Sequence, residues 1–162
     1  MLKRLHNNSA FTLIELLVTI SIFTFLMGAV YSTFLVGNRS WMTASDKVAL
    51  QREARWALFA ITKELREAQD IFITNDITST RIDFNRPTVG KVTYSLDSVG
   101  SDANKIIRQE GSRKRIIARD ISYLSFTYLT TDAITVEIAA TRKPVWGPEI
   151  SFYLKGKVVL RL

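Results

Sequence analysis

Residues 11–36, FTLIELLVTISIFTFLMGAVYSTFLV, decide how the rest of the chain is organised. From residue 16 to residue 36 the only ionisable side chain is that of Tyr31. An apolar run of about 20 residues is long enough to cross a bilayer as a helix, and lipid leaves a single span no other form. The leader before it, MLKRLHNNSA, carries Lys3 and Arg4. Basic residues beside a span stay on the cytoplasmic side, which predicts an internal N-terminus and an external C-terminal domain.

Glu15 is the only charged residue in this apolar stretch. A carboxylate close to the start of a span is costly and usually marks a function. One interpretation is that Glu15 lies near the interface and extends into the headgroups. The other is that cleavage between Ala10 and Phe11 creates an α-amino group at Phe11. The amine of one subunit and Glu15 of its neighbour would then neutralise each other, since buried charges are tolerated when they are paired.

The sequence FTLIELLVTISIF after a short basic leader resembles the N-terminal cleavage and methylation signal of type IV pilins and type II secretion pseudopilins. The matching residues are Phe11, Thr12, Leu13, Ile14, Glu15, Leu16 and Leu17. The resemblance implies that a prepilin peptidase removes the leader on the cytoplasmic face and methylates the new N-terminus at Phe11. One departure is Ala10, where the family usually has glycine. The competing interpretation, a secretory signal peptide, fits poorly because the apolar run is too long and no small-x-small site follows it.

Composition narrows the possible chemistry. The chain has 162 residues, which predicts one domain beyond the span. It contains no cysteine, and its only histidine, His6, lies in the leader. These counts exclude disulfides, thiolate metal sites and histidine-dependent triads, and they argue against a zinc hydrolase. We therefore predict a chain that is not an enzyme, with no catalytic residue, cofactor or metal. The net charge of +7 suits anionic surfaces in general and identifies none of them.

After the span, residues 37–70 form the predicted second half of the same helix. Its apolar stripe consists of Ala54, Ala57, Leu58, Ile61, Leu65 and Ala68. The opposite face carries Arg52, Arg55, Lys63, Glu64, Arg66 and Glu67. Lys63 with Glu67, and Arg66 with Asp70, have the spacing of weak pairs across one turn. No proline occurs from residue 11 to residue 70, so a continuous helix would be about 90 Å long, with a soft spot around Gly37.

From residue 71 the apolar period changes to two, which predicts antiparallel strands with one buried face. The predicted strands are 81–85, 91–96, 104–109, 115–118, 122–130 and 133–139, followed by a hairpin of 150–154 and 158–162 that turns at Lys155 and Gly156. The predicted fold class is α+β, a long N-terminal helix with a mostly antiparallel sheet on its outer half. The predicted divisions are a leader, 1–10, a membrane half, 11–36, an amphipathic half, 37–70, and a sheet domain, 71–162.

The order of the later segments is similar to that of J-type minor pseudopilins of type II secretion and of W-type minor pilins. This resemblance implies a structural subunit that helps to initiate or cap a filament and so supports protein secretion. Its implied partners are other minor and major pilins or pseudopilins, the prepilin peptidase, the inner-membrane assembly platform and membrane lipid. The implied location is the inner membrane, crossed once, with the C-terminal domain in the periplasm or outside the cell.

Three other features have a functional and a plain interpretation. Asp97 and Asp102 flank a loop and could bind calcium, but two carboxylates do not make a site. The basic run 113–115 could contact phosphates, or it could be a solvated hairpin tip. Trp146 could contact a partner or could plug the end of the sheet. Two alternative functions follow, a pilin-like DNA-binding subunit for DNA uptake and an unprocessed membrane-anchored binding module. The sequence does not favour nucleic acid as a partner.

Overall fold

The computed structural model describes residues 12–73, 78–97, 104–130 and 133–160. The chain divides into two compact units, Met1–Met42 and Thr43–Leu162. The first unit holds the N-terminal part of helix α1 (Leu13–Arg66), and the second holds the C-terminal part of α1 with all of the described strands. The fold class is α+β, as predicted.

Helix α1 is a single element of 54 residues, without a break at Gly37. At 1.5 Å per residue this corresponds to about 81 Å. It ends at Arg66, four residues before the predicted end at residue 70. The amides of Glu67 and Ala68 donate to carbonyls three residues back, which tightens the last turn, and Asp70 has a positive φ of 48°. The chain then enters a strand that the periodicity did not predict.

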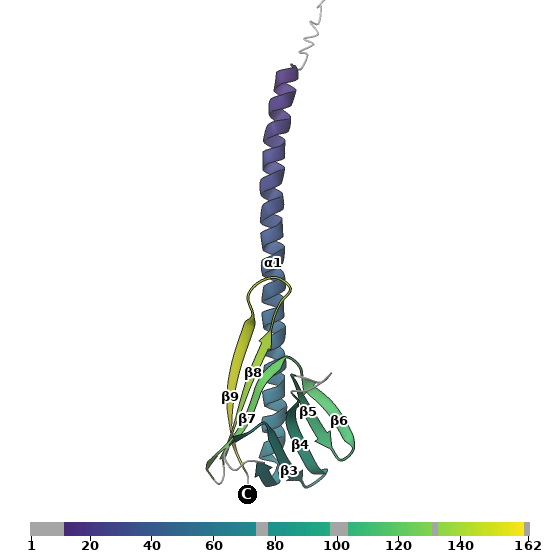
Figure 1. Cartoon of the computed structure of the whole chain (residues 1–162), viewed down its shortest axis with the longest axis vertical. Coiled ribbons are helices and arrows are strands. Elements are labelled where there is room, and N and C mark those ends of the chain that lie inside the picture. The colour runs from purple at the N-terminus through teal and green to yellow at the C-terminus, as the bar shows by residue number, and fades with distance from the viewer. Residues whose placement is uncertain (1–11, 74–77, 98–103, 131–132, 161–162) are drawn as a thin grey trace, which may run out of the picture. The chain divides into compact units, whose positions relative to one another are not determined.

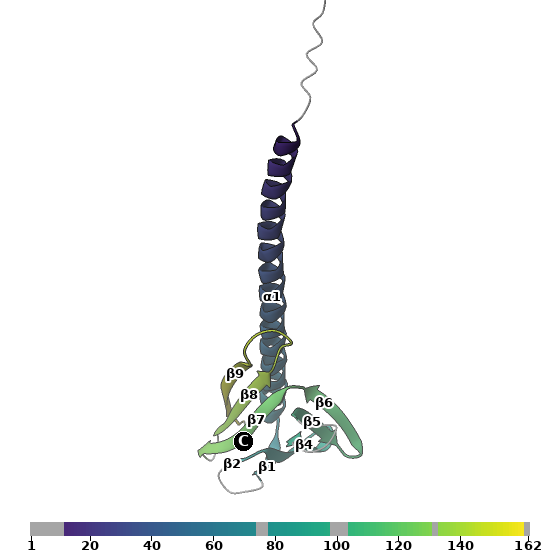
Figure 2. The same cartoon turned by 45° about the horizontal axis from the view of Figure 1, so that its top comes forward.

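Two antiparallel sheets follow the helix (Figure 1). The described strands are β1 (Gln69–Ile73), β2 (Thr78–Ser79), β3 (Arg81–Arg86), β4 (Gly90–Asp97), β5 (Lys105–Glu110), β6 (Arg113–Ala118), β7 (Ile121–Thr130), β8 (Ala133–Arg142) and β9 (Ile150–Val159). One sheet has the order β1-β3-β4-β5-β6 and the other has the order β2-β7-β8-β9. Figure 2 shows the short strands β1 and β2, which the sequence did not predict. The six strands predicted from residue 81 to residue 139 are confirmed, with shifted ends.

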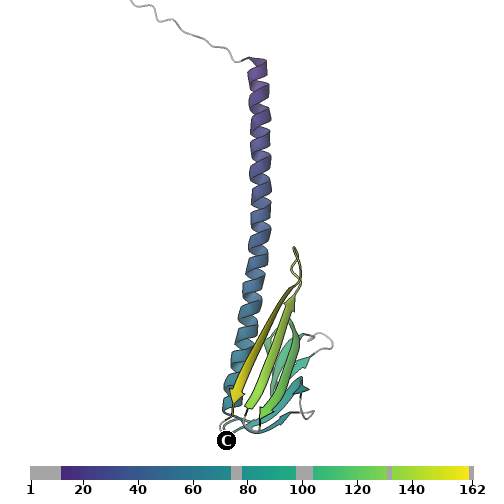
Figure 3. The ribbon, with the colours of Figure 1, turned by 90° about the vertical axis from the view of Figure 1, so that its left-hand side faces the viewer.

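The core of the second unit lies between α1 and the two sheets, and Figure 3 shows the C-terminal part of the helix running along one side of the strands. The fully buried helix residues are Leu50, Ala54, Ala57, Ile61 and Leu65. Phe84 on β3 and Tyr94 on β4 face them from the larger sheet, and the centroids of their stacked rings are 6.1 Å apart. Phe126 and Ile138 face the same helix residues from the smaller sheet. One stripe of α1 therefore serves both sheets.

Strand β9 corrects the predicted C-terminal hairpin. It pairs with β8 along its whole length, from Ile150 opposite Arg142 to Val159 opposite Ala133, and does not turn at Gly156. A Cβ atom at Gly156 would lie 3.0 Å from Cδ1 of Leu58 on α1. Glycine is therefore at this position because the helix and the strand approach closely, a known role for glycine inside strands.

This close approach predicts the effect of a larger residue. Gly156→Val is expected to lower the free energy of unfolding by about 1–3 kcal/mol, because the added methyl groups collide with Leu58. The measurement is the urea midpoint of the full chain in detergent micelles. Lys157→Val, the next residue on the exposed face, is the matched control and should change the free energy by less than about 0.5 kcal/mol. Equal effects of the two substitutions would show that the approach is not limiting.

Candidate functional site

The N-terminal part of α1 is apolar on every side. Its large side chains are exposed, Phe25 to 83 % and Phe34 to 66 %. The helix is long and apolar enough to cross a membrane, and none of its most apolar stretch is buried. A helix that is hydrophobic all round requires an apolar environment, either lipid or other helices. The predicted apolar helix is confirmed, and it indicates membrane anchoring.

The hydroxyl groups in this part of the helix bond to its own backbone. Thr19 donates to the carbonyl of Glu15 at 2.7 Å, and Thr24 donates to that of Ile20 at 2.8 Å. Ser21 makes the same bond to the carbonyl of Leu17, four residues back. A polar group in hydrocarbon needs an internal partner, so these side chains are compatible with a lipid environment.

Glu15 lies in the first turn of α1, in a capping pattern that the sequence analysis missed. Thr12 is the N-cap, and its carbonyl accepts hydrogen bonds from the amides of Glu15 at 3.1 Å and Leu16 at 3.2 Å. The hydroxyl of Thr12 also accepts from the Glu15 amide at 3.4 Å. Threonine followed three residues later by glutamate is the signature of a capping box, which the sequence already contains. A carboxylate here also suits the positive end of the helix dipole.

Ala10 and Phe11 lie outside the described residues. The cleavage position, the methylated N-terminus and the pairing of Glu15 with a neighbouring amine therefore stay predictions. The sequence pattern gives Glu15 two possible roles, capping and pairing, and these differ in their need for a charge.

At the other end of α1, acidic residues bind arginines of the larger sheet. Glu64 accepts two bonds from Nε of Arg108, at 3.0 and 3.1 Å, and lies 3.6 Å from Arg86. Glu67 accepts from Arg86 at 2.6 Å, so the predicted pair of Lys63 with Glu67 is wrong. The predicted helical pair of Arg66 with Asp70 is also wrong, because Asp70 lies in β1. Although burial opposes its charge, the hydrogen bonds that Arg108 donates to Glu110 and Glu64 raise the pKa of Arg108 above its ordinary value.

A second ion cluster connects α1 with the smaller sheet. Arg142, at the end of β8, lies 2.5 Å from Asp120, 3.6 Å from Asp46 and 3.8 Å from Glu53. Its hydrogen bond to Asp120 raises the pKa of Arg142. Asp120 has a positive φ of 56° just before β7. The helix therefore presents its acids to the sheets.

The basic residues of α1 from residue 52 onward face outward. They are Arg52, Arg55, Lys63 and Arg66, and none has an ion pair within the part of the chain that the structure describes. Between them lie the exposed rings of Trp56 and Phe59, with centroids 6.1 Å apart. The outer face of α1 is therefore cationic and aromatic.

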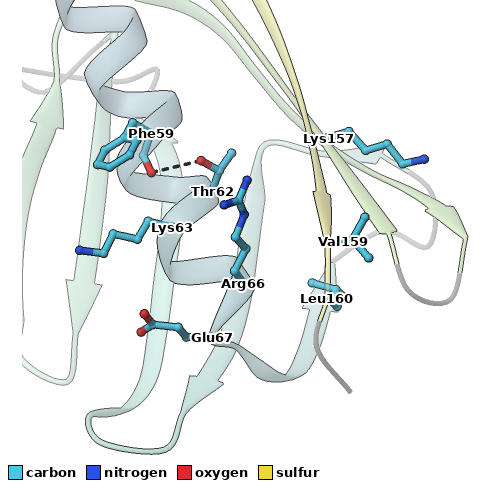
Figure 4. Close-up of a pocket in the computed structure, with 8 residues that line it drawn as sticks. All are labelled: Phe59, Thr62, Lys63, Arg66, Glu67, Lys157, Val159 and Leu160. Atoms are coloured by element: carbon cyan, nitrogen blue, oxygen red, sulfur yellow. Dashed lines mark hydrogen bonds between the residues drawn. The ribbon is translucent and has the colours of Figure 1, made fainter.

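A groove of about 660 Å³ lies between the end of α1 and β9 (Figure 4). Its lining residues are Phe59, Thr62, Lys63, Arg66, Glu67, Lys157, Val159 and Leu160. In a small-molecule site a few polar groups converge on the bound ligand. In Figure 4 the ammonium groups of Lys63 and Lys157 point to opposite sides, so the groove does not form such a site.

The other sequence candidates are scattered. Asp97 ends β4, Asp102 lies outside the described residues, and among those described no cluster of three or more potential metal ligands occurs. The basic run 113–115 is exposed on β6, the edge strand of the larger sheet. Trp146 is 52 % exposed in the loop between β8 and β9, so it does not plug the sheet.

A similarity to a known motif agrees with the long apolar helix at the N-terminus. The prokaryotic N-terminal methylation motif matches residues 5–31. No curated protein and no solved structure matches the chain. The motif, the long helix and the antiparallel sheets support a type IV pilin-like family. Such subunits are generally structural, are processed by a prepilin peptidase and assemble with other pilins.

The ion cluster at the end of α1 predicts a cost for removing its central acid. Glu64→Ala is expected to lower the free energy of unfolding by about 1–3 kcal/mol, because it leaves the half-buried Arg108 with one carboxylate fewer. The measurement is the thermal midpoint of the full chain in detergent. Glu149→Ala, an exposed acid without a described ion pair, is the control. A midpoint no lower than that of the control would show that the cluster is energetically neutral.

Proposed function

We propose that the chain is a minor pilin or pseudopilin, a structural subunit without enzymatic activity. In this role it helps to initiate or cap a type II secretion pseudopilus or a type IV pilus and thereby supports protein secretion. The observation that carries the proposal is the methylation motif at residues 5–31, which runs into an uncovered apolar stretch of α1 whose only acid is Glu15. The partners are other minor and major subunits and the inner-membrane assembly platform.

In the proposed mechanism the helix crosses the inner membrane with the leader in the cytoplasm and the sheet domain outside. The prepilin peptidase cuts between Ala10 and Phe11 and methylates the new terminus. Glu15 then pairs with the Phe11 amine of a neighbouring subunit. Two opposite charges in a medium of low dielectric constant attract strongly at short range and are costly apart. This pairing sets the axial register at which a subunit enters the filament.

Glutamine separates the two roles of Glu15, because it keeps the capping box and removes the charge. Both Glu15→Gln and Glu15→Ala are expected to reduce assembly, since breaking a buried pair costs about 3–5 kcal/mol, or more than about 100-fold in the pairing equilibrium. The measurement is the number of assembled filaments, or the amount of secreted cargo, in cells with the other subunits.

Two controls make this experiment decisive. N-terminal sequencing must show that each variant starts at Phe11, and Thr12→Ala, which loses the cap hydroxyl and keeps the charge, should still assemble. If Glu15→Gln assembles normally and Glu15→Ala does not, capping is the function of Glu15 and the pairing mechanism is wrong. A start at Met1 or Leu2 would favour the unprocessed membrane-anchored binding module.

The exposed run Arg113–Lys114–Arg115 on β6 favours one second candidate, a DNA-binding subunit. Three phosphate contacts would give a slope of about −3 for the logarithm of affinity against the logarithm of salt concentration. We expect no such binding by the full chain in detergent at about 150 mM salt in a gel-shift assay. A shift with this slope that is lost when all three residues are replaced by alanine would instead support DNA uptake.

A further inference from the structure

We propose that the β8–β9 loop, residues 143–149, is a lipid-contacting surface that lies against the outer headgroup layer of the membrane. The inference rests on the membrane placement of α1 in the proposed function and adds a second point of contact. It concerns a segment far from the N-terminal motif in the sequence.

The loop, KPVWGPE, exposes an apolar tip on a fixed base. Val145 is 89 % exposed and Trp146 is 52 % exposed, whereas Pro144 beside them is buried. Tryptophan combines a large apolar ring with a polar N–H group and is enriched where hydrocarbon meets water. Lys143 and Glu149 cancel in charge, so the contact is aromatic and apolar and does not require an anionic lipid.

The loop is attached to α1 near the end of its apolar part. The hydroxyl of Thr43 donates a hydrogen bond to the carbonyl of Trp146 at 3.1 Å. Gly147 has a φ of +112° and lies so close to Thr43 that an added Cβ would be 3.6 Å from its hydroxyl oxygen. Figure 1 shows the loop joining the ends of β8 and β9. Thr43 therefore fixes the position of the tip along the helix.

The length of chain between the span and Thr43 places this tip at headgroup depth. Thr43 is seven residues beyond Val36, the last apolar residue of the span, which corresponds to about 10 Å along a helix. The headgroup layers add about 10–15 Å in total to a hydrocarbon core of about 30 Å. Thr43 then lies just outside the headgroups of one leaflet, within reach of the side chains of Val145 and Trp146.

The size of the tip favours lipid over a protein partner. A stable protein interface uses about 20–30 residues on each side. Here two exposed apolar side chains stand between a lysine and a glutamate, which resembles the aromatic anchors of membrane interfaces.

The test uses the three tryptophans as depth probes in the full chain, reconstituted in phosphatidylcholine vesicles. Pairwise tryptophan-to-phenylalanine substitutions leave Trp41, Trp56 or Trp146 alone. Phosphatidylcholine with a nitroxide on its headgroup then quenches any tryptophan at that depth. Trp41 and Trp146 should be quenched at least about two-fold more than Trp56, which is thirteen residues beyond Thr43 and about 20 Å further along the helix.

A charge at the tip provides the second measurement. In the protein with Trp146 alone, Val145→Asp should lower the quenching by about two-fold or more, because a carboxylate disfavours the interface. Val89→Asp, in the exposed β3–β4 turn of the other sheet, is the matched control and should leave it unchanged.

The outcomes separate the two proposals. If Trp41 is quenched and Trp146 behaves like Trp56, the loop faces water or a protein, and this inference is wrong while the membrane placement stands. If Trp41 is not quenched, the membrane placement itself fails and the loop contact fails with it.

Discussion

One stripe of α1 holds the second unit together. Both sheets pack on five fully buried residues of this helix, which are Leu50, Ala54, Ala57, Ile61 and Leu65. The two alanines let the backbone of the helix approach the strands closely, and Gly156 meets that approach from β9. Burial of this kind is the main favourable contribution to folding, so the stability of the second unit depends on these five residues.

Charge follows the same division of the helix surface. Glu53 and Glu64 flank the buried stripe and bind sheet arginines, whereas Arg55 and Arg66 face outward. The acids help to fix how each sheet is rotated on the helix, because the planar guanidinium group of an arginine binds a carboxylate in few orientations. The outward face, with Trp56 and Phe59, is left available for surfaces outside this domain.

The sequence predicted the features that depend on local periodicity and on the N-terminal signal. Ile82 with Phe84, and Leu124 with Phe126, alternate clearly, and their strands are where the alternation placed them. The apolar run and Glu15 likewise indicated the long helix and the N-terminal methylation motif. Those features needed no information from distant parts of the chain.

The errors share one cause, which is that a distant residue decided the local structure. A glycine at position 156 is compatible with a turn and with a strand. Only its close approach to Leu58, about a hundred residues earlier, distinguishes the two cases. Glu67 has helical spacing from Lys63, but Arg86 binds it from β3. Trp146 could not be placed without the bond from Thr43.

The continuity of α1 also has a mechanical consequence. The helix continues without interruption from its apolar N-terminal part into the part whose buried stripe packs against the sheets. A force that reaches the second unit through the helix therefore acts as shear between α1 and the strands, and it loads the packing of several turns at once. Shear of this kind resists rupture better than peeling, in which contacts yield one after another. A helix packed in this way can pass tension to both sheets.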